Sequence, residues 1–303
     1  MSEATAKKVK GERKKFKKNF VNKNNFPYIV LTPAVLLFTL FVAYPAIASF
    51  VLSFQQRIDG ESTFVGFLNY TRLFFDPVFY QALFNTFIIL IFQVPIMLFL
   101  GLIIAVCLNS SLIKFKGFFR VAFFLPAVTS LVAASLIFLL LLNDDYGLIN
   151  YLLGLVGLPE IAWLSDSFWA KVSLILLTTW RWTGYNMVII LAGLQGVSKE
   201  LYEAASIDGA GTIKKFFTIT IPQLKPVLLF CFVLSTIGTF QLFDEPFNLT
   251  AGGPNDATLT ITYFLYQQGF EFFDFGYASA IAYIIVILVA VLSWVQFKLT
   301  GDE

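Results

Sequence analysis

The stretch LYEAASIDGAGTIKKFFTITIPQLKP, residues 201–226, is a polar segment between two strongly apolar parts of the chain. Ser198 is placed to act as an N-cap and Glu200 follows in the first turn, so a helix is predicted to start there. Gly209 and Gly211 are predicted to end this helix, since glycine adopts the left-handed backbone that other residues resist.

A second helix, IKKFFTIT, is predicted to follow the glycines. Thr212 is expected to cap its start, and Pro222 and Pro226 are expected to end it. The small side chains of Ala204 and Ala205 would let a partner approach the first helix closely. The insert is therefore predicted to be a projecting helix-turn-helix; the alternative is an ordinary amphipathic connector resting on the membrane.

Composition places the chain among polytopic membrane proteins. Of its 303 residues 58% are hydrophobic and only 13% are charged, 36 are phenylalanine, and the mean hydropathy is +0.78. Soluble domains do not have this composition. The sequence contains no histidine, and Cys107 and Cys231 both lie in apolar runs, so we expect no metal centre, histidine base or disulfide framework.

A hydrocarbon core about 30 Å thick needs about 20 apolar residues of helix. Six runs meet this requirement: residues 28–54, 84–108, 121–142, 172–194, 227–243 and 277–297. Two shorter apolar segments, 64–75 and 148–156, are expected to lie at the membrane interface. The chain is thus predicted to be an all-α membrane protein, with an N-terminal arm (1–27) and a six-span domain (28–303) whose polar insert covers 198–226.

The distribution of basic residues predicts the orientation. With six spans, the face that holds both termini carries 17 of the 21 basic residues, and such loops are normally cytoplasmic. These residues are Lys7, Lys8, Lys10, Arg13, Lys14, Lys15, Lys17, Lys18, Lys23, Lys114, Lys116, Arg120, Lys199, Lys214, Lys215, Lys225 and Lys298. Both termini are therefore predicted to be cytoplasmic.

The arm itself, KKVKGERKKFKKNF, allows two interpretations. It could bind anionic lipid or nucleic acid specifically, or it could be a solvated topology determinant against the anionic leaflet, which we favour. The apolar stretch that follows is too long for a signal peptide, so we expect the first span to be retained.

Ionisable residues within the predicted spans are few. Arg181 is the one central candidate, and Asp244 and Glu245 stand at the end of the fifth span. An ion-coupled carrier usually needs a buried carboxylate relay, and an intramembrane enzyme needs a nucleophile and a base. Neither pattern is present, which disfavours both classes.

Uncharged polar groups are more plentiful in the spans: Asn85, Thr86, Gln93, Thr178, Thr179, Asn186, Ser235, Thr236, Thr239 and Gln241. They could hydrogen-bond a polyhydroxylated solute, against whose apolar face aromatic side chains could stack: Trp180, Trp182, Tyr185 and Phe240. Alternatively, the hydroxyls bond back to their own helices or across to neighbouring helices, and the aromatic rings face lipid. The clustering in the fourth and fifth spans, on either side of the polar insert, favours a functional role.

The spacing within the insert resembles a known family pattern. EAA at 203–205 is followed after three residues by Gly209, after nine by Ile219 and after one by Ile-Pro at 221–222. This is similar to the EAA loop of ABC importer permeases, in which the pattern is EAA, three residues, Gly, nine residues, Ile, one residue, Leu-Pro. Isoleucine at 221 is the one departure. The spacing argues against a simple connector.

Longer segments narrow the resemblance. YNMVIILAGLQGVSKELYEAASIDGAG, NDDYGLINYLLGLVG, FNLTAGGPNDATLTITYFLYQQGF and FGYASAIAYIIVIL resemble carbohydrate-uptake permeases, in particular the first-permease branch of the maltose type. The likeness runs from about residue 121 to the end and does not include the arm.

This resemblance implies a type I importer in a bacterial or archaeal cytoplasmic membrane. The chain would pair with a second, similar permease, two ATPase subunits and an extracytoplasmic sugar-binding protein, and it would contact membrane lipid but no nucleic acid. ATP and Mg²⁺ would bind to the ATPases, so this chain is expected to be no enzyme and to hold no cofactor. Consistent with this, the glycine-rich TAGGPNDA lacks the GK[ST] of a phosphate-binding loop; it is either a loop that touches the binding protein or merely a turn.

The resemblance also implies roles for individual residues. In the family the EAA helix, which lies between the fourth and fifth spans, seats in a groove of the ATPase and transmits its closure to the spans. Here the coupling residues would be Glu203, Ala204, Ala205, Asp208, Gly209 and Pro222, with Glu203 paired to a cation of the ATPase and Gly209 setting the turn.

By position, Tyr185, Ser235 and Thr239 match sugar-contacting residues of the maltose-type transporter, whereas Trp182 and Leu242 replace smaller or polar residues. A different oligosaccharide or a modified sugar is thus expected rather than maltose. The predicted substrate path is Trp182, Tyr185, Asn186, Ser235, Thr239 and Gln241. An importer of a non-sugar solute, such as a polyamine or glycerol phosphate, is the alternative, and a phosphate group would give Arg181 a role.

Overall fold

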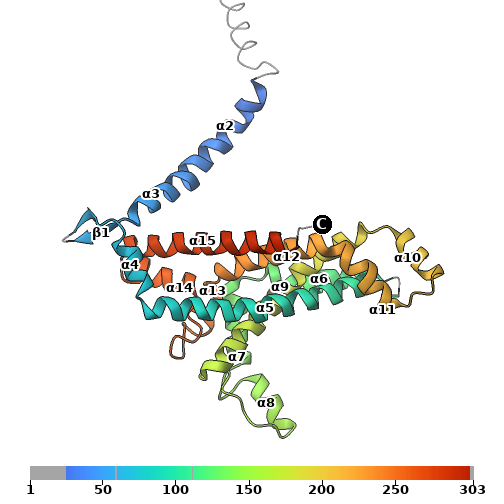
Figure 1. Ribbon diagram of the computed structural model, residues 1–303. Coiled ribbons are helices and arrows are strands. Elements are labelled where there is room, and N and C mark those ends of the chain that lie inside the picture. Colours follow the sequence, from blue (N-terminus) through green and yellow to red (C-terminus); the bar gives the residue numbers. More distant parts are fainter. Residues whose placement is uncertain (1–24, 59, 111, 301–303) are drawn as a thin grey trace, which may run out of the picture.

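The structure is a computed structural model that describes residues 25–58, 60–110 and 112–300. It is almost entirely helical (Figure 1). In this part of the chain four helical segments are long and apolar enough to cross a membrane, or five if a bent pair of helices counts as one span. Residues 1–24, which hold nearly the whole basic arm and its nine basic residues, lie outside the described part.

The first predicted span is a helix that leaves the rest of the molecule. It comprises α2 (Phe26–Phe38), a π-helical turn η1 (Thr39–Ala43) and α3 (Tyr44–Leu52), and none of its side chains is buried. Figure 1 shows it extending away from the packed helices, which it meets only near α3. Its apolar surface is therefore covered by lipid or protein and not by this chain.

A small hairpin follows, which the prediction of an all-α chain missed. Strands β1 (Gln55–Ile58) and β2 (Glu61–Phe64) pair antiparallel, and α4 (Leu68–Phe74) comes next. The buried side-chain amide of Asn69 donates to the carbonyls of Ser53 and Gln55, at 2.9 Å each. This amide fixes the turn from the first span into α4.

Four long helices form the packed body: α5 (Pro77–Asn109), α9 (Ser167–Gln195), α12 (Ile221–Phe240) and α15 (Phe275–Thr300). Helix α12 contacts the other three, and α5 packs along α9. Asp76 and Asp166 cap α5 and α9 by accepting backbone N–H bonds of 2.8–3.4 Å from the first turns. Helices α5, α9 and α12 begin five to seven residues before the apolar runs that predicted them, and α15 begins two residues before its run.

The predicted span 121–142 is not one straight helix. It consists of α6 (Lys116–Val128) and α7 (Leu131–Leu141), which meet at an angle of 96°. Thr129 and Ser130 have extended backbones and make the break. Helix α6 packs against α9, whereas α7 turns away to contact α8 (Leu148–Leu155) and α13 (Asp244–Leu249).

The polar insert begins as predicted and ends differently. Helix α10 (Lys199–Ile207) starts with the hydroxyl of Ser198 accepting the Glu200 N–H at 3.2 Å, and Gly209 has the left-handed φ of +74°. The prediction that Thr212 caps the second helix is wrong. Gly211 occupies the N-cap position of α11 (Thr212–Lys215), and no side chain caps it.

The predicted end of the second helix at the prolines is also wrong. A π-helical turn η2 (Phe216–Thr220) joins α11 to α12, so residues 212–240 form one long apolar segment. Pro222 lies in the first turn of α12, where its missing N–H leaves no bond unmade. Pro226 lies inside the helix without ending it.

Helices α13, α14 (Ile261–Tyr266) and η3 (Gln267–Glu271) connect α12 to α15 at the end of the body that carries α4. Helix α10 lies at the opposite end (Figure 1). At the α4 end, Arg72 forms an ion pair of 2.6 Å with Asp274 and lies over the ring of Tyr277. The Tyr277 hydroxyl donates to Asp76 at 2.7 Å, which ties α15 to the start of α5.

Candidate functional site

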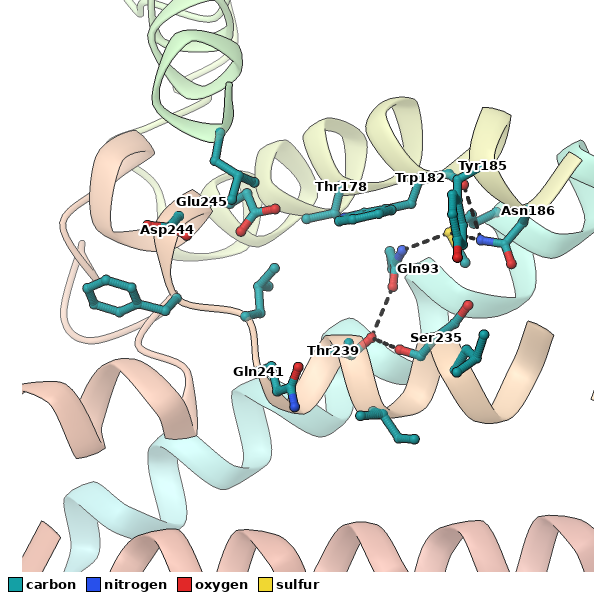
Figure 2. Close-up of a pocket in the computed structure, with 17 residues that line it drawn as sticks. Gln93, Thr178, Trp182, Tyr185, Asn186, Ser235, Thr239, Gln241, Asp244 and Glu245 are labelled. Carbon is teal, nitrogen blue, oxygen red and sulfur yellow. Dashed lines mark hydrogen bonds between the residues drawn. The ribbon is translucent and has the colours of Figure 1, made fainter. Parts of the chain in front are cut away.

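A pocket of about 410 Å³ lies among α5, α9, α12 and the junction of α12 with α13 (Figure 2). All six residues of the predicted substrate path line it: Trp182, Tyr185, Asn186, Ser235, Thr239 and Gln241. The pocket is also lined by residues that were not part of the predicted substrate path: Gln93, Met97, Leu131, Thr178, Leu234, Ile237, Gly238, Leu242, Phe243, Asp244 and Glu245. Three helices and one helix junction thus build a single cavity.

Helix α9 supplies an aromatic wall. The rings of Trp182 and Tyr185 lie edge to face, with centroids 5.8 Å apart and planes at 87°. Asn186 is one turn beyond Trp182, and its amide donates to the Trp182 carbonyl at 3.1 Å. Asn186 is 3% exposed and Tyr185 38% exposed, so the wall runs from a closed interior to an open side.

The opposite wall comes from α12 and α5, which are joined by a hydrogen bond. The Thr239 hydroxyl donates to its own helix at Ser235 O (2.9 Å) and to Gln93 Oε1 (3.3 Å). The Gln93 amide in turn donates to Met97 Sδ at 3.2 Å. These contacts satisfy most of the polar atoms of Gln93 and Thr239, so both side chains are held in place.

Two carboxyl groups lie at the end of the pocket opposite Tyr185 and Asn186 (Figure 2). Asp244 is half-buried and Glu245 is 4% exposed. Burial raises the pKa of Glu245, whereas attraction to Arg181 and a hydrogen bond from Trp182 lower it, and burial is the larger effect. Both residues belong to α13, beyond the end of α12.

Arg181 does not line the pocket. Its guanidinium donates from Nη1 to the Thr129 carbonyl at 2.7 Å and from Nη2 to the Ala127 carbonyl at 3.5 Å. These carbonyls lie at the end of α6, where the third span breaks. Arg181 is therefore engaged in holding a helix end and not in contacting the cavity.

Other polar and aromatic candidates also lie elsewhere. Phe240 is fully buried against Phe87, and Trp180 packs on Phe138. Asn85 donates to the carbonyls of Asp256 and Leu259. These side chains have partners within the protein and do not line the pocket.

The predicted coupling residues form a separate surface at the α10 end. Glu203, Ala204, Asp208, Gly209 and Pro222 are exposed, and Ala205 is half-buried. Large apolar side chains beside them are also exposed: Ile207, at 88%, Ile213 and Phe217.

Contacts within the insert give α10 a fixed direction. The hydroxyls of Tyr202 and Thr220 are 3.0 Å apart, and Lys215 Nζ donates to Ser206 Oγ at 2.5 Å. Three residues, 196–198, join α10 to α9, the helix that carries the aromatic wall of the pocket. Among the residues that the structure describes, no three acidic or cysteine side chains converge to hold a metal ion.

Comparisons with known proteins agree on one family. The family model described as "Binding-protein-dependent transport system inner membrane component" matches residues 62–299. The lactose transport system permease protein LacF of Rhizobium radiobacter is 47% identical over 275 residues, 89% of this chain and 92% of LacF. The arabinooligosaccharides transport system permease protein AraP of Bacillus subtilis is 41% identical over 285 residues, 93% of this chain and 91% of AraP.

Among solved structures, a chain of a bacterial alginate ABC transporter, in complex with a periplasmic protein bound to an alginate pentasaccharide, has a TM-score of 0.80. It is 22% identical and the match covers 93% of this chain and 95% of that one. This likeness shows the fold.

Proposed function

Since the chain belongs to the family of binding-protein-dependent transport system inner membrane components, we propose that it is the permease subunit of an ATP-driven importer of sugars or oligosaccharides. The observation that carries this proposal is the pocket, because it gathers all six residues of the predicted path in one cavity. Its volume of about 410 Å³ falls within the range of about 300–1,000 Å³ typical of small-molecule sites.

The lining of the pocket supports a saccharide as cargo. Trp182 and Tyr185 offer aromatic surface for the apolar face of a sugar ring, and Ser235, Gln241 and Asn186 offer hydrogen-bonding groups. The names of LacF and AraP refer to lactose and arabinooligosaccharides. The glycerol phosphate alternative loses its support, because Arg181 is engaged with carbonyls outside the cavity.

We further propose that the chain crosses the membrane six times. In this arrangement α9 is the fourth span and the bent pair α6–α7 the third. Helix α9 has 29 residues, so at about 1.5 Å per residue it exceeds a hydrocarbon core of about 30 Å. Its lower hydropathy follows from its buried position among α5, α6 and α12. The α10 end, with Lys199, Lys214 and Lys215, and both termini then face the cytoplasm.

Helix α10 is proposed to dock on a cytoplasmic ATPase through Glu203–Gly209, while the α4 end receives sugar from an extracytoplasmic binding protein. A second permease would complete the translocation path, and two ATPases would bind ATP and Mg²⁺. Support comes from the exposed Glu203, Ala204 and Asp208, from the EAA spacing, and from the family description, which names a binding-protein-dependent system.

Uptake assays test the substrate path. We expect Tyr185→Ala and Thr239→Ala to weaken sugar uptake by about tenfold, a loss equivalent to one or two hydrogen bonds or ring contacts, while the transporter still assembles. Trp180→Ala is the matched control, since this aromatic side chain lies on α9 but packs on Phe138. If both pocket variants import every tested sugar with wild-type kinetics, these residues do not contact the cargo.

A further inference from the structure

We infer that the pocket selects neutral, hydroxyl-rich saccharides against anionic ones, and that Asp244 and Glu245 produce this selectivity. The inference rests on the proposed function and names the substrate class of the same pocket. It follows from three features: the charges of the side chains that line the cavity, the hydrogen-bonding groups of the lining that the protein does not already engage, and the position of Arg181.

The charges that line the cavity have one sign. Within the part of the chain that the structure describes, Asp244 and Glu245 are the only acidic side chains in its lining, and no lysine or arginine lines it. An anionic cargo would therefore lose its hydration on entering a site with two carboxyl groups and no cationic side chain in its lining. This loss of hydration costs free energy in a partly buried setting. A protonated Glu245 would lessen the repulsion but would still supply no positive charge.

The guanidinium of Arg181 is engaged outside the cavity. Arg181 Nη1 and Nη2 donate to the carbonyls of Thr129 and Ala127, and the residue is 5% exposed. The positive charge of Arg181 attracts the Glu245 carboxyl group through space. To turn Nη1 and Nη2 toward an anion in the pocket, Arg181 would have to give up its bonds to the part-buried carbonyls of Thr129 and Ala127 at the end of α6.

The hydrogen-bonding groups at the Asp244–Glu245 end of the pocket favour a cargo that donates. Gln93 is engaged with Thr239 and Met97, and the Thr178 hydroxyl donates to its own helix at Leu174 O. The carboxyl groups of Asp244 and Glu245 add four oxygens at one end of the pocket, of which the Trp182 bond to Glu245 uses a part.

An ionised carboxylate accepts hydrogen bonds and donates none. Saccharide hydroxyls donate readily, and hydrogen bonds to a charged acceptor are stronger than neutral ones. The uronate or phosphate oxygens of an anionic sugar only accept, so they have no partner at this end. The same two residues thus attract hydroxyl groups and repel anions.

A matched pair of disaccharides tests the inference directly. Galactobiose and digalacturonate differ in the group at C6, a hydroxymethyl in one and a carboxylate in the other. Their binding is measured by calorimetry on the assembled transporter in lipid nanodiscs without its binding protein, so that the pocket alone discriminates. Lactose and arabinotriose serve as further neutral probes. The variants are Asp244→Asn, Glu245→Gln and the double change, with Asp256→Asn as control for an exposed carboxylate outside the pocket.

We expect the wild-type transporter to bind galactobiose at least about tenfold more tightly than digalacturonate, and the double variant to bring this ratio close to one. The Asp256→Asn control should keep the wild-type ratio. Equal binding of the two disaccharides by the wild type, or an unchanged ratio in the double variant, overturns the inference. If none of the neutral probes binds, the sugar path itself is wrong and the inference falls with it.

Discussion

The Arg181 guanidinium donates to the Thr129 carbonyl at 2.7 Å, at the point where the third predicted span breaks. A cation at the C-terminal end of a helix satisfies carbonyls that the helix leaves unpaired and interacts favourably with its dipole. Because Arg181 belongs to α9, the helix next to α10, this contact links the proposed coupling helix to the bend between α6 and α7. The one charged residue in the middle of a predicted span is thus structural.

Replacing Arg181 should weaken the fold at this bend. Arg181→Met removes both donors and leaves the Thr129 carbonyl unpaired, for an expected cost of about 1.5–3 kcal/mol. Arg181→Lys should recover part of this stability, since an ammonium group makes one of the two bonds. Thermal unfolding in detergent measures the effect. The control is Lys171→Met, a loss of positive charge on the same helix. Equal unfolding temperatures for Arg181→Met and the control would contradict the role of the guanidinium.

Gly184 lets α6 and α9 approach closely. A Cβ at this position would lie 1.7 Å from the Phe123 carbonyl oxygen, and this oxygen belongs to the backbone and cannot move alone. Gly184→Ala should therefore push α6 away and destabilise the protein by about 1–3 kcal/mol, as overpacking does elsewhere.

The same thermal unfolding assay checks Gly184→Ala, with Gly117→Ala as control, because a Cβ at Gly117 meets nothing within 4 Å. An alanine at 184 that unfolds at the wild-type temperature would show that the two helices do not pack at this distance.

Much of the fold was predictable, because membrane spans appear in the sequence as long apolar runs. The helices over 77–109 and 275–299 cover their predicted spans, and the helix over 26–52 covers all but the last two residues of the first span, 28–54. Ser198 and Gly209 bound α10 as expected. The bend at Thr129–Ser130 was not predicted, because residues 121–142 form one apolar run in the sequence and the residue that holds the break lies 52 positions away.

Prolines misled the prediction of the insert. Pro222 and Pro226 were expected to end a helix, but a proline in the first turn of α12 costs no hydrogen bond, and the π-helical turn η2 joins this helix to α11. Sequence alone does not distinguish a proline that ends one helix from a proline that starts the next.

The pocket was predictable in part. The fourth and fifth spans carried visible clusters of polar and aromatic residues, and the structure brings their six predicted members together; that they contact cargo stays a prediction. Gln93 and Thr178 were recognised as polar but not as members of the pocket. Pairing Gln93 with Thr239 requires knowing that α5 packs on α12, which neither helix encodes locally.

The coupling role of α10 is the central claim. Gly209 has a φ of +74°, which proline cannot adopt, so Gly209→Pro should redirect α10. Glu203→Lys reverses the charge proposed to meet a cation of the ATPase. Two controls match them: Gly211→Ala, where φ is −70° and the space is open, and Glu200→Lys, an exposed charge reversal on α10 outside the predicted coupling residues.

The most direct measurement is sugar uptake and ATP hydrolysis by proteoliposomes that contain the permeases, the ATPases and the binding protein. We predict that Glu203→Lys and Gly209→Pro insert and fold but lose ATP-driven uptake and the stimulation of ATP hydrolysis by the loaded binding protein, while both controls keep them. Normal uptake by Glu203→Lys and Gly209→Pro would contradict the claim that α10 transmits the force of the ATPase to the pocket.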